Sequence, residues 1–132
     1  MAINDISVDK KVYELLKQGL NASSLRSKVS ANNIANINTK GYKRSYVTFE
    51  DSLKNSMGNA ELLTTDERHI NIEGNGNIKV LKDNATSMRE DGNNVDIDNE
   101  MVNQAANNLM YNALITQVNN RLSITKYVIE GK

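Results

Sequence analysis

The chain has 132 residues, of which 39% are hydrophobic and only 5% aromatic, and it contains no cysteine and no proline. Such a polar composition predicts one small, thinly cored domain that depends on self-association for part of its stability, without disulfides, thiolate metal sites or a cysteine nucleophile. Sixteen basic residues balance sixteen acidic ones, so a dedicated binder of nucleic acid or anionic membranes is not expected.

The first predicted element is a long helix from about Val8 to Ile37. Asp5 or Ser7 is available as its N-cap, because a side-chain oxygen there accepts a free backbone N–H of the first turn. Gly41 is expected to end the helix with a positive φ, and Tyr42 begins the exit from it.

One face of this helix carries apolar side chains at seven-residue spacing. The same count places Asn32 and Asn36 on that face, where an unpaired buried amide costs about 1–3 kcal/mol and therefore needs a polar partner. Asparagine is also abundant throughout the chain, so composition alone scatters some of it onto helix faces. The apolar members of the predicted face are Val8, Leu15, Ala22, Leu25 and Val29.

The middle of the chain predicts a short helix followed by an extended segment. Apolar spacing over Phe49–Met57 favours the helix, with Thr48 and Asp51 as its capping box and Gly58 as its end. Beyond it, β-like runs at residues 69–72 and 78–81 surround the glycines of residues 74–76, which favours a β-hairpin or an extended loop.

A second long helix is predicted from about Asp98 to Ile129. Asp96 or Asp98 can cap it, and Glu100 suits its positive N-terminal end. Its predicted buried face also alternates apolar and amide side chains, carried by Met101, Ala105, Asn108, Asn112, Ile115, Asn119, Leu122 and Ile129. Further apolar residues lie off that face, so one partner helix cannot cover them all and association with other chains is the simpler expectation.

Catalytic, metal and cofactor sites are not expected. The acidic segment 91–100 lacks the spacing of a calcium loop and is better explained as a turn before a helix cap. His69 is the single histidine and has no catalytic companions. The basic and aromatic residues 42–46 offer too few phosphate contacts for nucleic acid.

The sequence thus predicts a mainly α fold. Its long N- and C-terminal helices pair antiparallel as a coiled-coil-like hairpin, with a short helix and an extended or β-hairpin middle segment. The expected parts are an N-terminal axial helix (1–41), a middle segment (42–96) and a C-terminal axial helix (97–132), which together form one assembly domain. The residues expected to pack between subunits are Val8, Leu15, Ala22, Leu25, Val29, Asn32, Asn33, Asn36, Met101, Ala105, Asn108, Asn112, Ile115 and Leu122.

The run Ala31–Asn36, followed by Asn38-Thr39 and Gly41-Tyr42-Lys43, resembles the N-terminal signature of the bacterial flagellar axial proteins of the rod and hook. The small size of the chain and its segments 63–70 and 91–100 are most similar to the rod members. Lys40 departs from the family, which usually has proline at this position, so the helix exit relies on Gly41 alone.

The resemblance implies a structural subunit of the proximal rod of the flagellar basal body. It would assemble with copies of itself and with rod paralogues such as FlgC, next to the FliE adaptor or the export gate, without nucleic acid, cofactor, small-molecule substrate or catalysis. It would reach the periplasmic rod through type III export, without a cleaved signal peptide. The alternative is a free-standing coiled-coil binding module or export adaptor, which would be a soluble, helical dimer of defined size.

Overall fold

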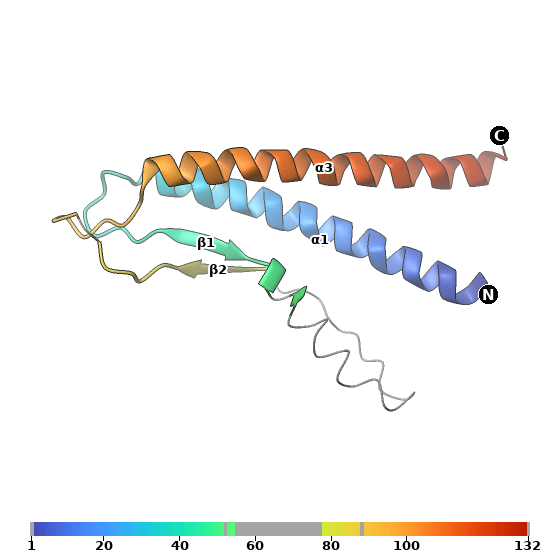
Figure 1. The fold of residues 1–132 in the computed structure, drawn as a ribbon, viewed down its shortest axis with the longest axis horizontal. Helices are drawn as coiled ribbons and strands as arrows, with labels where there is room; N and C mark the ends of the chain where they lie inside the picture. Colours follow the sequence, from blue (N-terminus) through green and yellow to red (C-terminus); the bar gives the residue numbers. More distant parts are fainter. Residues whose placement is uncertain (1, 52, 55–77, 88, 132) are drawn as a thin grey trace, which may run out of the picture.

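The computed structural model describes residues 2–51, 53, 54, 78–87 and 89–131. Its elements are α1 (Ala2–Ala35), β1 (Ser45–Thr48), β2 (Lys79–Lys82) and α3 (Ile97–Glu130), and Figure 1 shows the two helices side by side at one end and apart at their free termini. The mainly α fold with paired terminal helices is therefore confirmed. Within the described residues, no helix is both long enough and apolar enough to cross a membrane.

The two helices run antiparallel. Ser23 bonds to Asn107 and Ser30 bonds to Glu100, so residue numbers rise along α1 as they fall along α3. We call the end where these contacts lie, formed by residues 19–49 and 93–114, the closed end.

α1 begins earlier than predicted. The helix starts at Ala2, so Asp5 and Ser7 lie inside it and the prediction that one of them caps it is wrong. No glycine or proline stands between Ala2 and Val8 to stop the helix from extending toward its N-terminus. Regular helix ends at Ala35, and turns lead to Gly41, whose φ of 71° confirms the predicted positive-φ exit.

α3 agrees with its predicted bounds to within one residue at each end. Asp96 is the N-cap, and its Oδ1 accepts the backbone N–H groups of Asp98 at 3.0 Å and Asn99 at 3.4 Å. Gly131 ends the helix in the left-handed region, with its N–H bonded to the carbonyl of Tyr127 at 3.0 Å.

β1 and β2 form a two-stranded antiparallel sheet, with Ser45 opposite Lys82 and Thr48 opposite Lys79. β2 matches the run predicted at 78–81 with a shift of one residue, whereas β1 was not predicted. The other predicted run, at residues 69–72, and the turn at 74–76 lie outside the described residues. The predicted short helix is described in part: residues 50, 51, 53 and 54 are helical, and the N–H of Leu53 bonds to the carbonyl of Phe49 at 2.9 Å. Residue 52 and the remainder from residue 55 to the predicted end at Gly58 lie outside the described residues.

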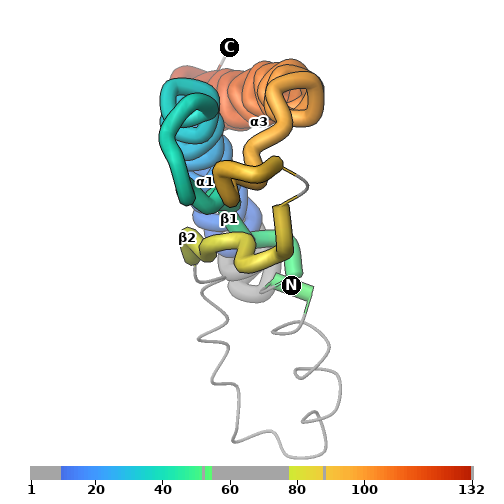
Figure 2. Tube along the Cα trace, turned by 90° about the vertical axis from the view of Figure 1, so that its left-hand side faces the viewer, coloured from blue at the N-terminus to red at the C-terminus, as the bar shows by residue number. Residues whose placement is uncertain are grey.

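The buried interior is small and lies at the closed end. In Figure 2, β1 and β2 lie below the helix pair and nearer to α1 than to α3, in keeping with the packing of β1 on α1. The buried apolar side chains are Ala22, Val29, Val47, Phe49 and Val95, and the buried polar ones are Ser23, Ser30, Asn33, Asn93, Glu100 and Asn107. Hydrogen bonds therefore hold the closed end together as much as apolar contact does.

Candidate functional site

Polar side chains line the contact between α1 and α3. Ser23 Oγ donates to Asn107 Oδ1 at 2.8 Å, and Asn107 Nδ2 donates back to the carbonyl of Ser23 at 2.9 Å. One turn away, Gln104 Nε2 donates to Ser27 Oγ at 2.8 Å. Because hydrogen bonds are directional, this ladder fixes the register of the two helices more sharply than apolar packing does.

The face of α3 that meets α1 differs from the predicted one. Glu100, Gln104 and Asn107 face α1, whereas Met101, Ala105 and Asn108 are exposed. The two sets are one residue apart, which is a rotation of about 100° around the helix axis. The prediction that the face containing Met101 and Asn108 is the one buried against α1 is therefore wrong.

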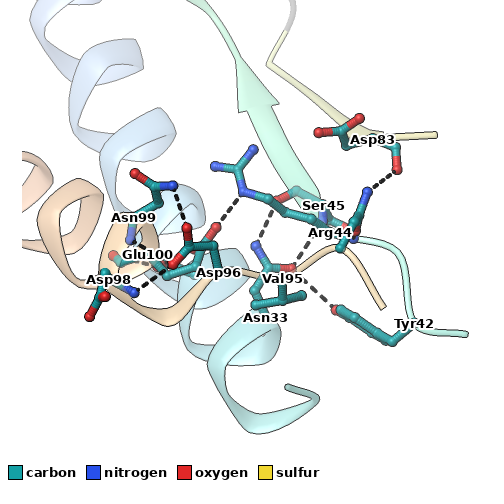
Figure 3. Close-up of polar contacts among 12 residues, drawn as sticks. Asn33, Tyr42, Arg44, Ser45, Asp83, Val95, Asp96, Asp98, Asn99 and Glu100 are labelled. Carbon is teal, nitrogen blue, oxygen red and sulfur yellow. Dashed lines mark hydrogen bonds and ion pairs between the residues drawn. The ribbon is translucent and has the colours of Figure 1, made fainter. Parts of the chain in front are cut away.

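Glu100 joins α3 to the segment that follows the helix exit. Its side chain is only 2% exposed, and its carboxylate accepts Arg44 Nε as an ion pair (Figure 3). The carboxylate also accepts the hydroxyl of Ser30 at 2.7 Å. A carboxylate this deeply buried is tolerated because a cation and a hydroxyl satisfy it. The predicted role of Glu100 in the first turn of α3 holds, but the sequence did not reveal its partners.

Asn33 joins α1 to β1. Its Nδ2 donates to the carbonyl of Ser45 at 2.8 Å, and its Oδ1 accepts the N–H of Ser45 at 3.0 Å and the hydroxyl of Tyr42 at 3.3 Å (Figure 3). The side chain is 1% exposed. The amide thus occupies the place that a residue of a neighbouring strand would take beside Ser45.

The prediction that Asn32 and Asn36 lie on the buried face is wrong within the single chain. Asn32 is exposed and Asn36 is half-buried. Asn36 Nδ2 bonds locally to the carbonyl of Asn32 at 2.8 Å, and Asn36 Oδ1 accepts the hydroxyl of Thr39 at 3.2 Å. The buried amide is Asn33, between them in sequence.

Asn93 is a buried residue that sequence reasoning missed. Its Nδ2 lies 2.9–3.0 Å from the carbonyl oxygens of Asn36, Ile37 and Thr39, and its side chain is 0% exposed. The Asn93 amide therefore adds a donor at carbonyls of the α1 exit that also accept the N–H of Thr39, the N–H of Tyr42 and Arg89 Nη1. The only local signal is its place after Gly92, which has a φ of 75°.

The predicted packing residues fall into two groups. Some are covered within the single chain: Ala22, Val29 and Asn33 are buried, and Leu25, Asn36 and Ile115 are half-buried. Others are open to another chain, namely Leu15, Asn32, Met101, Ala105, Asn108, Asn112 and Leu122. Val8 belongs to the part of α1 whose side chains are not described.

α3 also exposes many large apolar side chains beyond those predicted for packing. They run along its whole length and comprise Ile97, Val102, Leu109, Met110, Tyr111, Ile124, Tyr127, Val128 and Ile129. Leu109 is 73% exposed and Ile129 78%. An apolar surface of this extent is typical of a protein interface.

The described residues bring no three histidine, aspartate or glutamate side chains together as a possible metal site. What they offer is a hydrogen-bonded closed end and a long exposed helix. This arrangement suits assembly with other protein chains.

Comparison with known proteins agrees with this arrangement. Residues 16–43, which cover the second half of α1 and the exit through Lys43, match a family model described as flagella basal body rod protein. The flagellar basal body rod protein FlgB of Bacillus subtilis is 35% identical over 117 residues, covering 88% of this chain and 91% of that protein. FlgB of Borrelia hermsii is 36% identical, covering 89% and 90%, and FlgB of Buchnera aphidicola subsp. Baizongia pistaciae is 30% identical, covering 98% and 99%. Because the relatives match most of its length, this chain belongs to the FlgB family of flagellar basal body rod proteins.

Proposed function

We propose that this chain is a structural subunit of the proximal rod of the flagellar basal body, joined to its neighbours through α1 and α3. The observation that carries the proposal is the outer surface of α3, where Val102 is 68% exposed, Leu109 73% and Val128 73%. Exposure of so many apolar side chains to water is unfavourable, and packing of α3 against other chains would bury them.

The exposure of the predicted packing residues in the single chain supports this role for part of them. Leu15, Asn32, Met101 and Leu122 are exposed and available to a neighbour, whereas Ala22 and Val29 already pack within the chain. We therefore assign contacts between subunits to the exposed group, and the internal hydrogen bonds to the shape of each subunit.

The uncharged character of α3 supports contact with a similar surface. No charged residue occurs between Glu100 and Arg121, and the intervening residues mix apolar side chains with amides. Amides can pair with amides of another chain, and apolar groups can pack between them without burying a charge.

The partners follow from family membership and are part of the proposal. We propose copies of the same chain and rod paralogues such as FlgC on one side, and the FliE adaptor or the export gate on the other. The location is then the periplasmic part of the basal body, reached by type III export without a cleaved signal peptide.

The test is recovery of the chain in isolated basal bodies. Cells lacking the native gene are complemented with the unaltered chain, Leu109→Asp or Leu109→Asn, and their basal bodies are probed for the chain. Because Leu109 is 73% exposed, neither change should disturb the fold of the subunit, which circular dichroism can check. We expect Leu109→Asp to be lost from basal bodies, because assembly would bury an unpaired charge, and Leu109→Asn to be retained in part.

Two results would count against this function. One is normal rods and motility in cells that lack the gene. The other is a purified chain that forms a stable dimer of defined size and never enters basal bodies, which would favour the free-standing binding module.

A further inference from the structure

Asp91 is the only aspartate in the sequence that is followed by a glycine. An aspartate in this setting can react with its own main chain, because the nitrogen of the next residue can attack the side-chain carbon Cγ and close a succinimide ring. Glycine has no Cβ, so Gly92 leaves this nitrogen unshielded and lets the backbone rotate freely. The dipeptide Asp91–Gly92 is therefore a candidate site of spontaneous modification.

The reaction requires no oxidant, cofactor or second protein. The Gly92 nitrogen forms a bond to Cγ of Asp91, and the amide proton leaves together with a hydroxyl of the carboxyl group as one water molecule. Water then opens the succinimide at one of its two carbonyls. Opening at Cγ restores aspartate, whereas opening at the main-chain carbonyl gives isoaspartate, in which the main chain runs through the side chain.

In the folded chain, a turn holds the Gly92 nitrogen away from Cγ. The N–H of Gly92 donates to the carbonyl of Arg89 at 3.0 Å, so Asp91 is the third residue of a β-turn. Among the described residues only glycines have a positive φ, which makes the turn type I, with a ψ of roughly 0° at Asp91. This ψ places the Gly92 nitrogen beside the backbone nitrogen of Asp91 and turns it away from the side chain.

The carboxylate of Asp91 is held as well. Its Oδ1 accepts the N–H of Asn93 at 3.0 Å, and its Oδ2 pairs with Arg89 Nη2 at 2.9 Å. Arg89 is in turn fixed to the end of α1, because its Nη1 donates to the carbonyl of Ile37 at 2.9 Å. Cγ therefore cannot turn toward the Gly92 nitrogen while these contacts persist.

The same turn anchors the exit from α1. The N–H of Gly41 donates to the carbonyl of Asp91 at 2.8 Å, and a Cβ added at Gly92 would lie 3.8 Å from Cα of Gly41. Isoaspartate at position 91 would lengthen the main chain by one carbon atom and displace the carbonyl that Gly41 uses. A chain modified in this way could not re-form the contact between the turn and the exit.

We propose that Asp91–Gly92 is a modification site that the fold protects, and that local opening of the turn lets Asp91 convert to isoaspartate. Segments of a folded protein open locally at a lower free energy than the whole molecule. The protection therefore depends on the contacts of Asp91, Arg89 and Gly92, and its loss makes the opening permanent. This chemistry is independent of the rod function proposed above.

Isoaspartate mapping of the purified full chain tests the proposal. The unaltered chain is incubated at neutral pH in water enriched in heavy oxygen, once folded and once in concentrated urea. Mass spectrometry then follows the peptide that contains Asp91, because each ring opening leaves one heavy oxygen atom in it, and fragmentation by electron transfer distinguishes isoaspartate from aspartate. We expect isoaspartate at position 91 to form several-fold faster in urea than in the folded chain.

The dipeptide Asn75–Gly76 is an internal control for the urea sample. Asparagine before glycine closes the same ring with loss of ammonia, so its deamidation shows that the conditions support the reaction. These two residues lie outside the described part of the chain, and the control uses only their behaviour in urea.

Two arginine variants test the role of the turn in the folded chain. Arg89→Met removes the ion pair with Asp91 and the bond to the carbonyl of Ile37, and it should raise the rate of isoaspartate formation several-fold. Arg26→Met is the matched control, because it also removes an arginine from an ion pair, here with Glu50 at 2.8 Å, but leaves this turn intact. Circular dichroism checks that both variants are folded, and if Arg89→Met is not, the unaltered chain still decides the question.

Equal rates for the unaltered chain with and without urea would overturn the protection by the fold. Ring closure at Asn75 without any at Asp91 in urea would overturn Asp91 as a modification site. A rate for folded Arg89→Met no higher than that for Arg26→Met would overturn the role of the Arg89 contacts. After removal of urea, chains with isoaspartate at position 91 should recover less helix than unmodified chains of the same sample, and equal recovery would overturn the predicted damage to the α1 exit.

Discussion

Asn33 pairs with Ser45 as a strand residue would, donating to its carbonyl at 2.8 Å and accepting its N–H at 3.0 Å. One side chain of α1 thus holds β1 against the helix pair. Because these two hydrogen bonds are partly buried, the loss of the Nδ2 donor of Asn33 would leave the carbonyl of Ser45 without this partner.

Replacing Asn33 with aspartate should therefore destabilise the subunit. Asn33→Asp keeps the shape but sets a carboxylate oxygen against the carbonyl of Ser45, and we expect the free energy of unfolding to fall by about 2 kcal/mol. Urea unfolding followed by circular dichroism measures it. Asn32→Asp, one residue away and exposed, is the control and should change stability by less than about 0.5 kcal/mol. Equal effects at both positions would refute the pairing role.

Removing Arg44 should cost more than removing Arg26. Arg44→Met leaves the carboxylate of Glu100, whose side chain is 2% exposed, without its cation, and a decrease of about 3 kcal/mol in unfolding free energy is expected. Arg26→Met breaks the more exposed pair with Glu50 and should cost less than about 1 kcal/mol. Adding Glu100→Gln to Arg44→Met should recover part of the loss, since no buried charge then remains. A double variant as unstable as the single one would contradict this account.

Asn93→Asp should also destabilise the closed end. The change removes the amide donors near three carbonyl oxygens of the α1 exit and places negative charge among them. We expect a loss of about 3 kcal/mol, measured as a lower urea midpoint. Asn38→Asp, exposed on the same exit, should be nearly neutral, and similar losses from both would argue against Asn93 as a residue that stabilises the α1 exit.

Glycine is favoured at position 41 because of the positive φ of the backbone, and not because a side chain there would meet a neighbouring atom. Its φ is 71°, and nothing lies within 4 Å of the position that a Cβ would take. Gly41→Val should therefore cost at least about 1 kcal/mol of unfolding free energy, whereas Gly41→Asn should cost less because asparagine tolerates the left-handed region. Thermal unfolding of the two variants checks the order, and valine tolerated as well as asparagine would show that the exit can adopt another conformation.

Amide hydrogen exchange in the purified monomer should follow the distribution of buried residues. Protection is expected in α1 around Ala22–Asn33 and in α3 around Glu100–Asn107, where the buried side chains lie. The free ends, residues 10–16 and 122–130, should exchange fast, because isolated helix is marginal in water and no second element buries these turns. Strong protection of both free ends in a verified monomer would argue against folding coupled to assembly.

The sequence by itself determined the two long helices, the positive φ at Gly41 and the family, because these depend on local periodicity, backbone preference and a short motif. It narrowed the N-cap of α3 to Asp96 or Asp98, and the structure selected Asp96. The sequence also indicated that amides would serve as contacts. Only the tertiary structure decided which ones, since Asn33, Asn93 and Asn107 are buried while Asn32, Asn108 and Asn112 are not. One position along a helix is a rotation of about 100°, so an error of one residue in the predicted face changes which side chains are buried. That rotation is set by partners far away in sequence, Ser23 with Asn107 and Arg44 with Glu100, and no local pattern records such pairings.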